Sequence, residues 1–132
     1  MRIAVDTNVL VRFLIWDDET QAGPAAAAIE AAETVVIPTL VLCETVCVLR
    51  RAYRRTVAEI VAVLRDLIAS RPVEVDRPAA EAGLAMLAAG GDFADGVVLH
   101  QAERARAAPM LTFDRAFADA ADPARVRLLA AG

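Results

Sequence analysis

Residues 1–8, MRIAVDTN, decide how the rest of the chain is interpreted. The first five residues form a short, mostly apolar run, which is typical of a buried strand in a parallel sheet. The run stops at Asp6, Thr7 and Asn8, and the apolar residues 9–11 follow. In open α/β sheets, ligands bind beyond the carboxyl ends of the strands. Asp6 is therefore either a helix cap or the beginning of a site, and this stretch alone favours neither.

Short apolar runs alternate with helical patterns along the whole chain. Expected strands cover residues 1–5, 34–37, 73–75, 110–112 and 126–129, and expected helices cover residues 9–15, 24–32, 40–54, 57–70, 78–89, 93–107 and 115–120. We expect Pro24 to open the second of these helices, Thr39 to cap the third, and Thr56 with Glu59 to form a capping box at the fourth. The alternation predicts an α/β fold of three layers, α/β/α, with a central parallel sheet flanked by helices. A length of 132 residues fits one domain, residues 1–132.

The composition limits the classes of protein. Hydrophobic residues make up 58 % of the chain and the mean hydropathy is +0.45, a surplus that predicts an apolar surface covered by a second copy or another partner. No apolar stretch is as long as a membrane span, and Asp6 interrupts any signal-peptide core, so we expect a cytoplasmic protein. A net charge of −4 is unlike that of a plain basic nucleic-acid binder. All fourteen positive residues are arginines, and the two cysteines with the single histidine form no zinc pattern.

Glu44 lies in a predicted helix that is apolar nearly all round, so we expect it to be buried. An ionised glutamate in such a place costs several kcal/mol unless something pairs with it. Glu44 then pairs with an arginine, lines a cleft or binds a cation.

Asp92 and Asp95 lie three residues apart and share one face of a predicted helix. We expect Asp92, which follows two glycines, to be the N-cap of that helix, with Asp95 at the third helical position. The apolar residues 96–99 come directly after Asp95, so its side chain is expected to turn toward the sheet. Burial therefore favours function for Asp95 and structure for Asp92.

Asp114 follows a predicted strand, as Asp6 does, and either caps the next helix or joins the same site. Parallel strands end at one edge of a sheet, so Asp6, Glu44, Asp95 and Asp114 could converge there. Four carboxylates at that spacing cannot all stay ionised without a cation. Oxygen ligands select a hard ion, Mg²⁺ or Mn²⁺, and such a site suits hydrolysis of a phosphate ester.

The order of these motifs resembles that of a known family. Residues 3–12 (IAVDTNVLVR), Glu44 after Ile37-Pro38, residues 91–98 (GDFADGVV) and residues 111–117 (LTFDRAF) occur in sequence. The chain resembles PIN-domain ribonucleases, and specifically the VapC toxins of bacterial toxin–antitoxin pairs. The resemblance covers residues 1–132.

The resemblance implies a PIN-like parallel sheet, Mg²⁺-dependent endoribonuclease activity and a cognate VapB-like antitoxin. It implies that Asp6 and Asp95 are the main metal ligands. Glu44 resembles a third acidic residue, which binds metal or orients the attacking water, and Asp114 resembles a fourth, which often acts through water or at a second metal. Thr7 and Asn8 resemble the polar residues that orient the cluster, with Asp92 in support. Gly96 departs from the pattern, where alanine or a larger residue is usual, and glycine within a helix costs about 1 kcal/mol relative to alanine.

Other interpretations stay open. A phosphotransfer domain also places aspartates at strand ends. By resemblance to such families it would need a lysine near the phosphoryl group, and this chain has no lysine. A solitary RNA-processing nuclease, or a PIN-like binding module without activity, would share the fold. The run Arg50, Arg51, Arg54 and Arg55 is either a solvated helix end or a contact for RNA phosphates or the antitoxin. The apolar surplus suggests a homodimer, and Trp16 with Phe13 belongs either to a partner surface or to the core.

Overall fold

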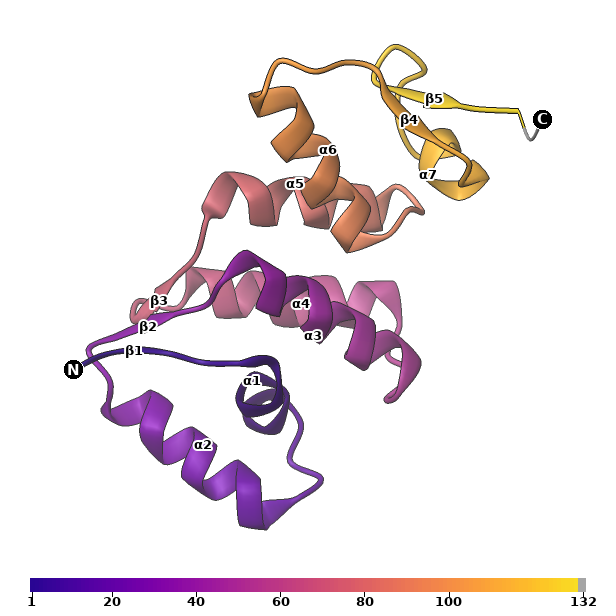
Figure 1. Ribbon diagram of the computed structural model, residues 1–132. Helices are drawn as coiled ribbons and strands as arrows, with labels where there is room; N and C mark the ends of the chain where they lie inside the picture. The colour runs from indigo at the N-terminus through magenta and orange to yellow at the C-terminus, as the bar shows by residue number, and fades with distance from the viewer. Residues whose placement is uncertain (131–132) are drawn as a thin grey trace. The chain divides into compact units, whose positions relative to one another are not determined.

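The computed structural model describes residues 1–130. The chain forms two compact units, Met1–Arg77 and Pro78–Gly132. Parallel strands and helices alternate in both units (Figure 1). The predicted class, α/β with helices flanking parallel strands, is confirmed.

A three-stranded parallel sheet runs through the first unit. It consists of β1 (Arg2–Ala4), β2 (Thr34–Val36) and β3 (Val73–Glu74) in the order β1-β2-β3. Ile3 is in register with Val35, and Val35 is in register with Val73. Val35 is only 1 % exposed, as expected for a β-branched residue in the middle strand of a sheet.

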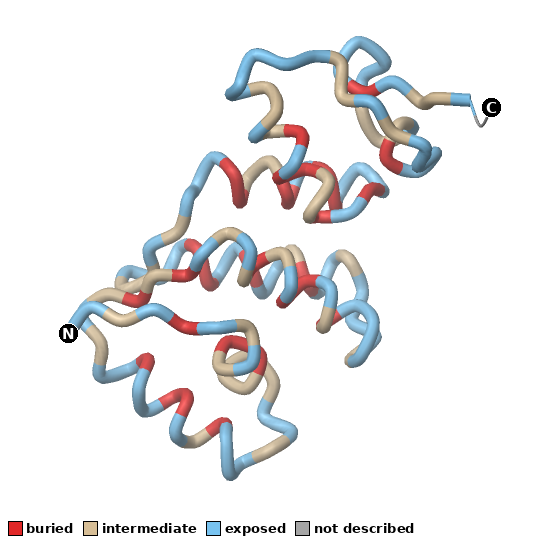
Figure 2. Tube along the Cα trace, in the orientation of Figure 1, coloured by how far each residue is buried: buried red, intermediate tan, exposed pale blue. Residues whose placement is uncertain are grey.

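Four helices complete the first unit: α1 (Thr7–Leu14), α2 (Glu19–Ala31), α3 (Thr39–Arg51) and α4 (Val57–Ala69). Helix α1 contacts α2 and α3, and α3 contacts α4. Buried positions recur along each helix between exposed ones, as amphipathic packing requires (Figure 2). The side chains that fill this core are Leu10, Leu42, Leu49, Ile60 and Leu64.

Helix starts in the first unit differ in part from expectation. Helix α2 begins five residues before Pro24, because the Asp18 side chain caps it by accepting from the Thr20 amide at 3.1 Å. Pro24 therefore lies inside the helix. Thr39 does not cap α3, whose N-cap is Pro38 with no side-chain bond. The capping box is confirmed, since the Glu59 amide donates to Thr56 at 3.2 Å and the Thr56 amide donates to Glu59 at 3.0 Å.

The second unit contains α5 (Arg77–Ala88), α6 (Phe93–Arg104), β4 (Met110–Thr112), α7 (Arg115–Asp119) and β5 (Val126–Leu128). Strands β4 and β5 pair in parallel. Met86, Leu99, Phe117 and Val126 form a buried cluster of this unit. The Arg125 guanidinium donates two hydrogen bonds to the Glu103 carboxylate, at 2.9 and 2.7 Å, and so ties β5 to the end of α6.

Gly96 marks a close approach of α6 to α5. A Cβ atom at this position would lie 2.4 Å from the Ala82 carbonyl oxygen and 2.9 Å from the Gly83 Cα atom. Backbone atoms cannot yield at such distances, so only glycine fits between the two helices. The departure at Gly96 from the usual motif is thus explained by packing, which outweighs the propensity cost of glycine.

None of the helices within residues 1–130 is both long enough and apolar enough to cross a membrane.

Candidate metal and RNA site

Asp6 is the N-cap of α1. Its backbone is extended, with φ −88° and ψ 177°, and its Oδ1 atom accepts from the Val9 amide at 3.0 Å. Within the described residues Oδ2 accepts no hydrogen bond, and the side chain is exposed. Asp6 is therefore a cap that still has one carboxylate oxygen free for a ligand. Thr7 and Asn8 follow as the first two residues of α1.

Glu44 is exposed, so the prediction that it is buried was wrong. The buried side of α3 carries Leu42, Thr45, Val46 and Leu49. The opposite side carries an exposed stripe of Leu40, Glu44, Cys47 and Arg51. Apolar residues occupy both sides of α3, and for that reason the sequence pattern could not tell which side faces the core. An exposed carboxylate needs no compensating partner, so burial no longer argues for a site at Glu44.

Asp92 occupies the N-cap position of α6, as predicted, but its side chain forms no capping hydrogen bond. Asp95 lies in the first turn of the same helix and is half-buried. Burial raises the pKa of Asp95 above its ordinary value, and the negative charges of Asp92 and Asp114 raise it further. Asp92 is thus a charged neighbour of Asp95 rather than a cap that merely closes the helix.

Asp114 is the N-cap of the short helix α7. Its Oδ1 atom accepts from the amides of Ala116 at 2.9 Å and Phe117 at 3.3 Å, and its own amide donates to the Thr112 hydroxyl at 2.9 Å. Of the two interpretations of Asp114, the helix cap is therefore observed, and its membership of a site stays a prediction. The charge of Asp114 also acts on Asp95, so Asp95 lies within electrostatic range of both Asp92 and Asp114.

These acidic side chains have the chemistry of a divalent-ion site but do not form a finished one. No group of three histidine, cysteine, aspartate or glutamate side chains within residues 1–130 is spaced to hold an ion. In the same range no arginine forms an ion pair with Asp92, Asp95 or Asp114. The charges of Asp92 and Asp114 raise the pKa of Asp95, and a hard cation beside these carboxylates would relieve the repulsion. Asp6 and Glu44 belong to the first unit, and the other three belong to the second.

The predicted basic run is exposed throughout. Arg50 and Arg51 end α3, and Arg54 and Arg55 lie in the turn that leads to α4. Arg54 has a left-handed backbone, with φ 52°, which is uncommon for a residue other than glycine.

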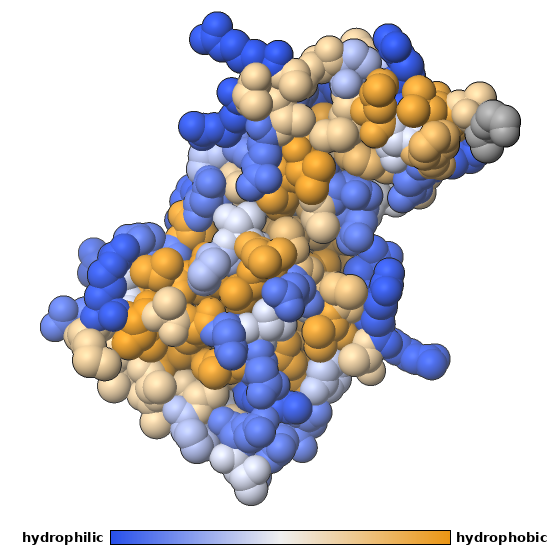
Figure 3. All heavy atoms as spheres, viewed as in Figure 1, coloured by the Kyte–Doolittle hydropathy of each residue, from blue (hydrophilic) through white to orange (hydrophobic). Residues whose placement is uncertain are grey.

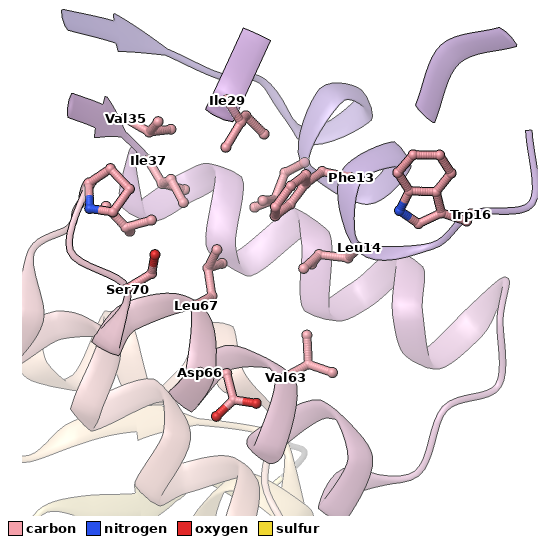
Figure 4. A pocket seen from close by; sticks show the side chains of 13 residues that line it. Phe13, Leu14, Trp16, Ile29, Val35, Ile37, Val63, Asp66, Leu67 and Ser70 are labelled. Atoms are coloured by element: carbon pink, nitrogen blue, oxygen red, sulfur yellow. The ribbon is translucent and has the colours of Figure 1, made fainter. Parts of the chain in front are cut away.

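An apolar groove of about 430 Å³ lies in the first unit between α1, α2 and α4. Phe13, Leu14, Val63 and Leu67 point into a common space in Figure 4. Trp16, which is 59 % exposed, lies at one end of the groove, so core packing is excluded for this side chain. Apolar residues also gather on the face of this unit seen in Figure 3. The sequence did not predict that α4 lines this groove. Val63 was a usable signal, because it is apolar and lies off the buried stripe of the helix.

Comparison with known proteins agrees with this chemistry. A family model described as PIN domain matches residues 3–123. No curated protein sequence matches the chain. PIN domains are generally nucleases and typically use divalent metal ions.

Proposed function

The chain belongs to the PIN domain family, and on that basis we propose that it is a Mg²⁺-dependent endoribonuclease with a four-carboxylate site. The observation that supports this most strongly is the raised pKa of Asp95, which is caused by burial and by the charges of Asp92 and Asp114. A protein gains no stability from such repulsion, and a bound cation would remove it. Carboxylates held in this state are typical of functional sites.

Each carboxylate has a proposed role. Asp6 and Asp95 hold Mg²⁺, or Mn²⁺ in its place, as the main ligands. Asp114 is a further ligand or acts through water. Thr7, Asn8 and Asp92 support the cluster. Because Asp6 and Asp114 each use one carboxylate oxygen as a helix cap, their orientation is fixed before any ion binds.

The proposed reaction is hydrolysis of an RNA phosphodiester bond. The oxygen of a water molecule bonds to phosphorus, and the bond from phosphorus to the 3′ oxygen breaks. The departing 3′ oxygen takes a proton from solvent water, so the products carry a 5′-phosphate and a 3′-hydroxyl. Glu44, the fourth carboxylate of the site, orients the attacking water and receives its proton, for which an exposed carboxylate on a rigid helix is suited. A divalent ion, when bound, neutralises charge on the phosphate and lowers the pKa of water.

The biological role we propose is that of a VapC-type toxin with a VapB-like antitoxin. The antitoxin occupies the groove of α1, α2 and α4 with an amphipathic helix, since the lining is apolar and an exposed carboxylate, Asp66, contributes to it. A basic residue on that helix would pair with Asp66. The apolar surplus supports a homodimer, and the proposed location is the cytoplasm.

Two alternatives make different predictions. A solitary RNA-processing nuclease would cut RNA but would have no small antitoxin gene overlapping the start of its own. A binding module without activity would bind RNA and leave it intact. The free acidic cluster of the second unit favours an active enzyme over the module, because a module has no need for it.

Incubation of the purified full chain with RNA tests the proposal. We expect cleavage with Mg²⁺, none with EDTA, and none by Asp6→Asn. Cleavage by Asp6→Asn at the wild-type rate would contradict the proposal.

A further inference from the structure

We propose that Arg50, Arg51, Arg54 and Arg55 form a docking surface for the RNA phosphate backbone, a few nucleotides from the scissile bond. This inference rests on the proposed nuclease function and identifies where that site holds its substrate. The four arginines are called the arginine turn below.

The arginine turn concentrates positive charge in an otherwise acidic chain. Four of the fourteen arginines fall within six residues, and the rest of the chain carries ten arginines against eighteen acidic residues. An acidic site repels RNA, so the attraction for phosphates has to come from another part of the surface. The arginine turn is the densest source of it.

These arginines are also free to bind a ligand. Among the residues that the structure describes, Arg50, Arg51 and Arg54 have no ion-pair partner. The charge of Arg55 acts on Glu59, but the two form no ion pair. A solvated helix end would account for Arg50 and Arg51, which lie in the last turn of α3. It does not account for Arg54 and Arg55, which lie beyond the helix.

The turn is held in place from within. The Tyr53 hydroxyl donates to Asp17 at 2.8 Å and accepts from Arg12 at 3.1 Å, so α1 anchors it. The Arg55 amide donates to the Leu49 carbonyl at 2.9 Å, and Arg54 between them is left-handed. These bonds fix the backbone of the turn, and with it the positions from which the four arginine side chains extend into solvent.

Helix α3 connects the arginine turn to the proposed site. Glu44, Cys47 and Arg51 lie on the same exposed stripe of this helix. Seven residues separate Glu44 from Arg51, which places them about 10 Å apart along the axis. An RNA strand whose scissile phosphate is at Glu44 therefore passes the arginine turn within a few nucleotides.

Binding in the absence of chemistry tests the inference. The probe is a fluorescent single-stranded oligouridylate of 20 nucleotides, and its anisotropy is measured with the full chain in EDTA over a series of KCl concentrations. We expect Arg51→Gln/Arg54→Gln to raise the Kd roughly 10-fold at low salt and to reduce the slope of log K against log salt by about 1.4, because two phosphate contacts are lost. Arg51→Lys/Arg54→Lys should restore most of the slope, since lysine also binds phosphate.

The matched control is Arg71→Gln/Arg104→Gln, which removes the same charge from two other exposed arginines. It should leave the Kd and the slope near the wild-type values. An unchanged Kd and slope in Arg51→Gln/Arg54→Gln would overturn the inference, and this is the result expected if the arginine turn binds an acidic protein instead. Cleavage by Asp6→Asn in Mg²⁺ is measured alongside, and wild-type activity there would contradict the nuclease proposal without affecting the binding result.

Discussion

The two units differ in the surroundings of their acidic residues. In the first unit, Asp6 and Glu44 are exposed, and Asp6 serves as a helix cap. In the second unit, Asp95 is half-buried beside the charges of Asp92 and Asp114, and its pKa is raised. The first unit also carries the arginine turn and the apolar groove. The two units therefore differ in where charge is concentrated: acidic repulsion around Asp95 in the second unit, and the exposed arginine turn together with an apolar groove in the first.

The largest effect is expected at Asp95. Replacement by asparagine removes a proposed ligand from the centre of the repulsive cluster. Since loss of a residue that only supports a ligand typically costs 10–100-fold, we expect at least a roughly 100-fold loss of RNA cleavage in Asp95→Asn. Asp119→Asn removes an exposed carboxylate of the same unit and should cut RNA normally. Comparable losses in both variants would show that net charge, and not the cluster, controls the rate.

Glycine-to-alanine substitutions should change stability with opposite signs in the two units. In the second unit, Gly96→Ala forces a Cβ atom against the backbone of α5 and should lower the free energy of unfolding by about 1–3 kcal/mol. In the first unit, Gly23 lies within α2, and nothing lies within 4 Å of its Cβ position. Gly23→Ala should therefore raise the free energy of unfolding by about 0.5–1 kcal/mol. Urea denaturation measures both. A stabilising Gly96→Ala would show that the close crossing of α5 and α6 is wrong.

The hydroxyl of Tyr53 should contribute about 1 kcal/mol to the first unit. Tyr53→Phe removes the hydrogen bonds to Asp17 and Arg12, while the Arg12–Asp17 ion pair at 2.8 Å can persist. Chemical denaturation is the measurement, and Ser70→Ala, which removes an exposed hydroxyl, is the control. Equal stability of Tyr53→Phe and wild type would mean that α1 does not anchor the arginine turn through this residue.

The smallest effect concerns the Glu103–Arg125 pair of the second unit. A hydrogen bond from Arg125 lowers the pKa of Glu103 below its ordinary value of 4.5, and the charge of Arg125 adds to the effect. The stability that this pair contributes is therefore present above pH 4.5 and is lost as the pH falls through the lowered pKa. Glu103→Gln should cost about 0.2–1 kcal/mol at neutral pH and progressively less in acid, as measured by denaturation at several pH values. A constant difference across that range would argue against the pair.

Local signals in the sequence predicted much of the fold. The β-branched run at residues 34–37 and the capping box of Thr56 with Glu59 each depend on a few neighbouring residues, and both occur where expected. The start of α2 was misplaced because Pro24 was expected at the first helical position, whereas Asp18 is the N-cap and Pro24 lies within the helix. Only the structure shows that the Asp18 side chain bonds to Thr20.

Sequence patterns could indicate which residues to consider for the candidate site, but not how buried those residues are or which charges surround them. Glu44 was expected to be buried because an apolar helix does not reveal which of its sides meets the core. Asp92 was expected to be a structural cap, since the rule for caps takes no account of the charges of Asp95 and Asp114 nearby. Gly96 could not be interpreted because the crossing of two helices is a property of the folded unit.

A calorimetric titration with Mg²⁺ tests the central proposal most directly, namely that Asp6 and Asp95 are ligands of a divalent ion. The titration compares wild type with Asp6→Asn from the first unit and Asp95→Asn from the second. We predict binding by wild type and at least a roughly 10-fold weaker affinity in each variant. Wild-type affinity in Asp6→Asn would contradict the account, because Asp6 would then not be a ligand of the ion.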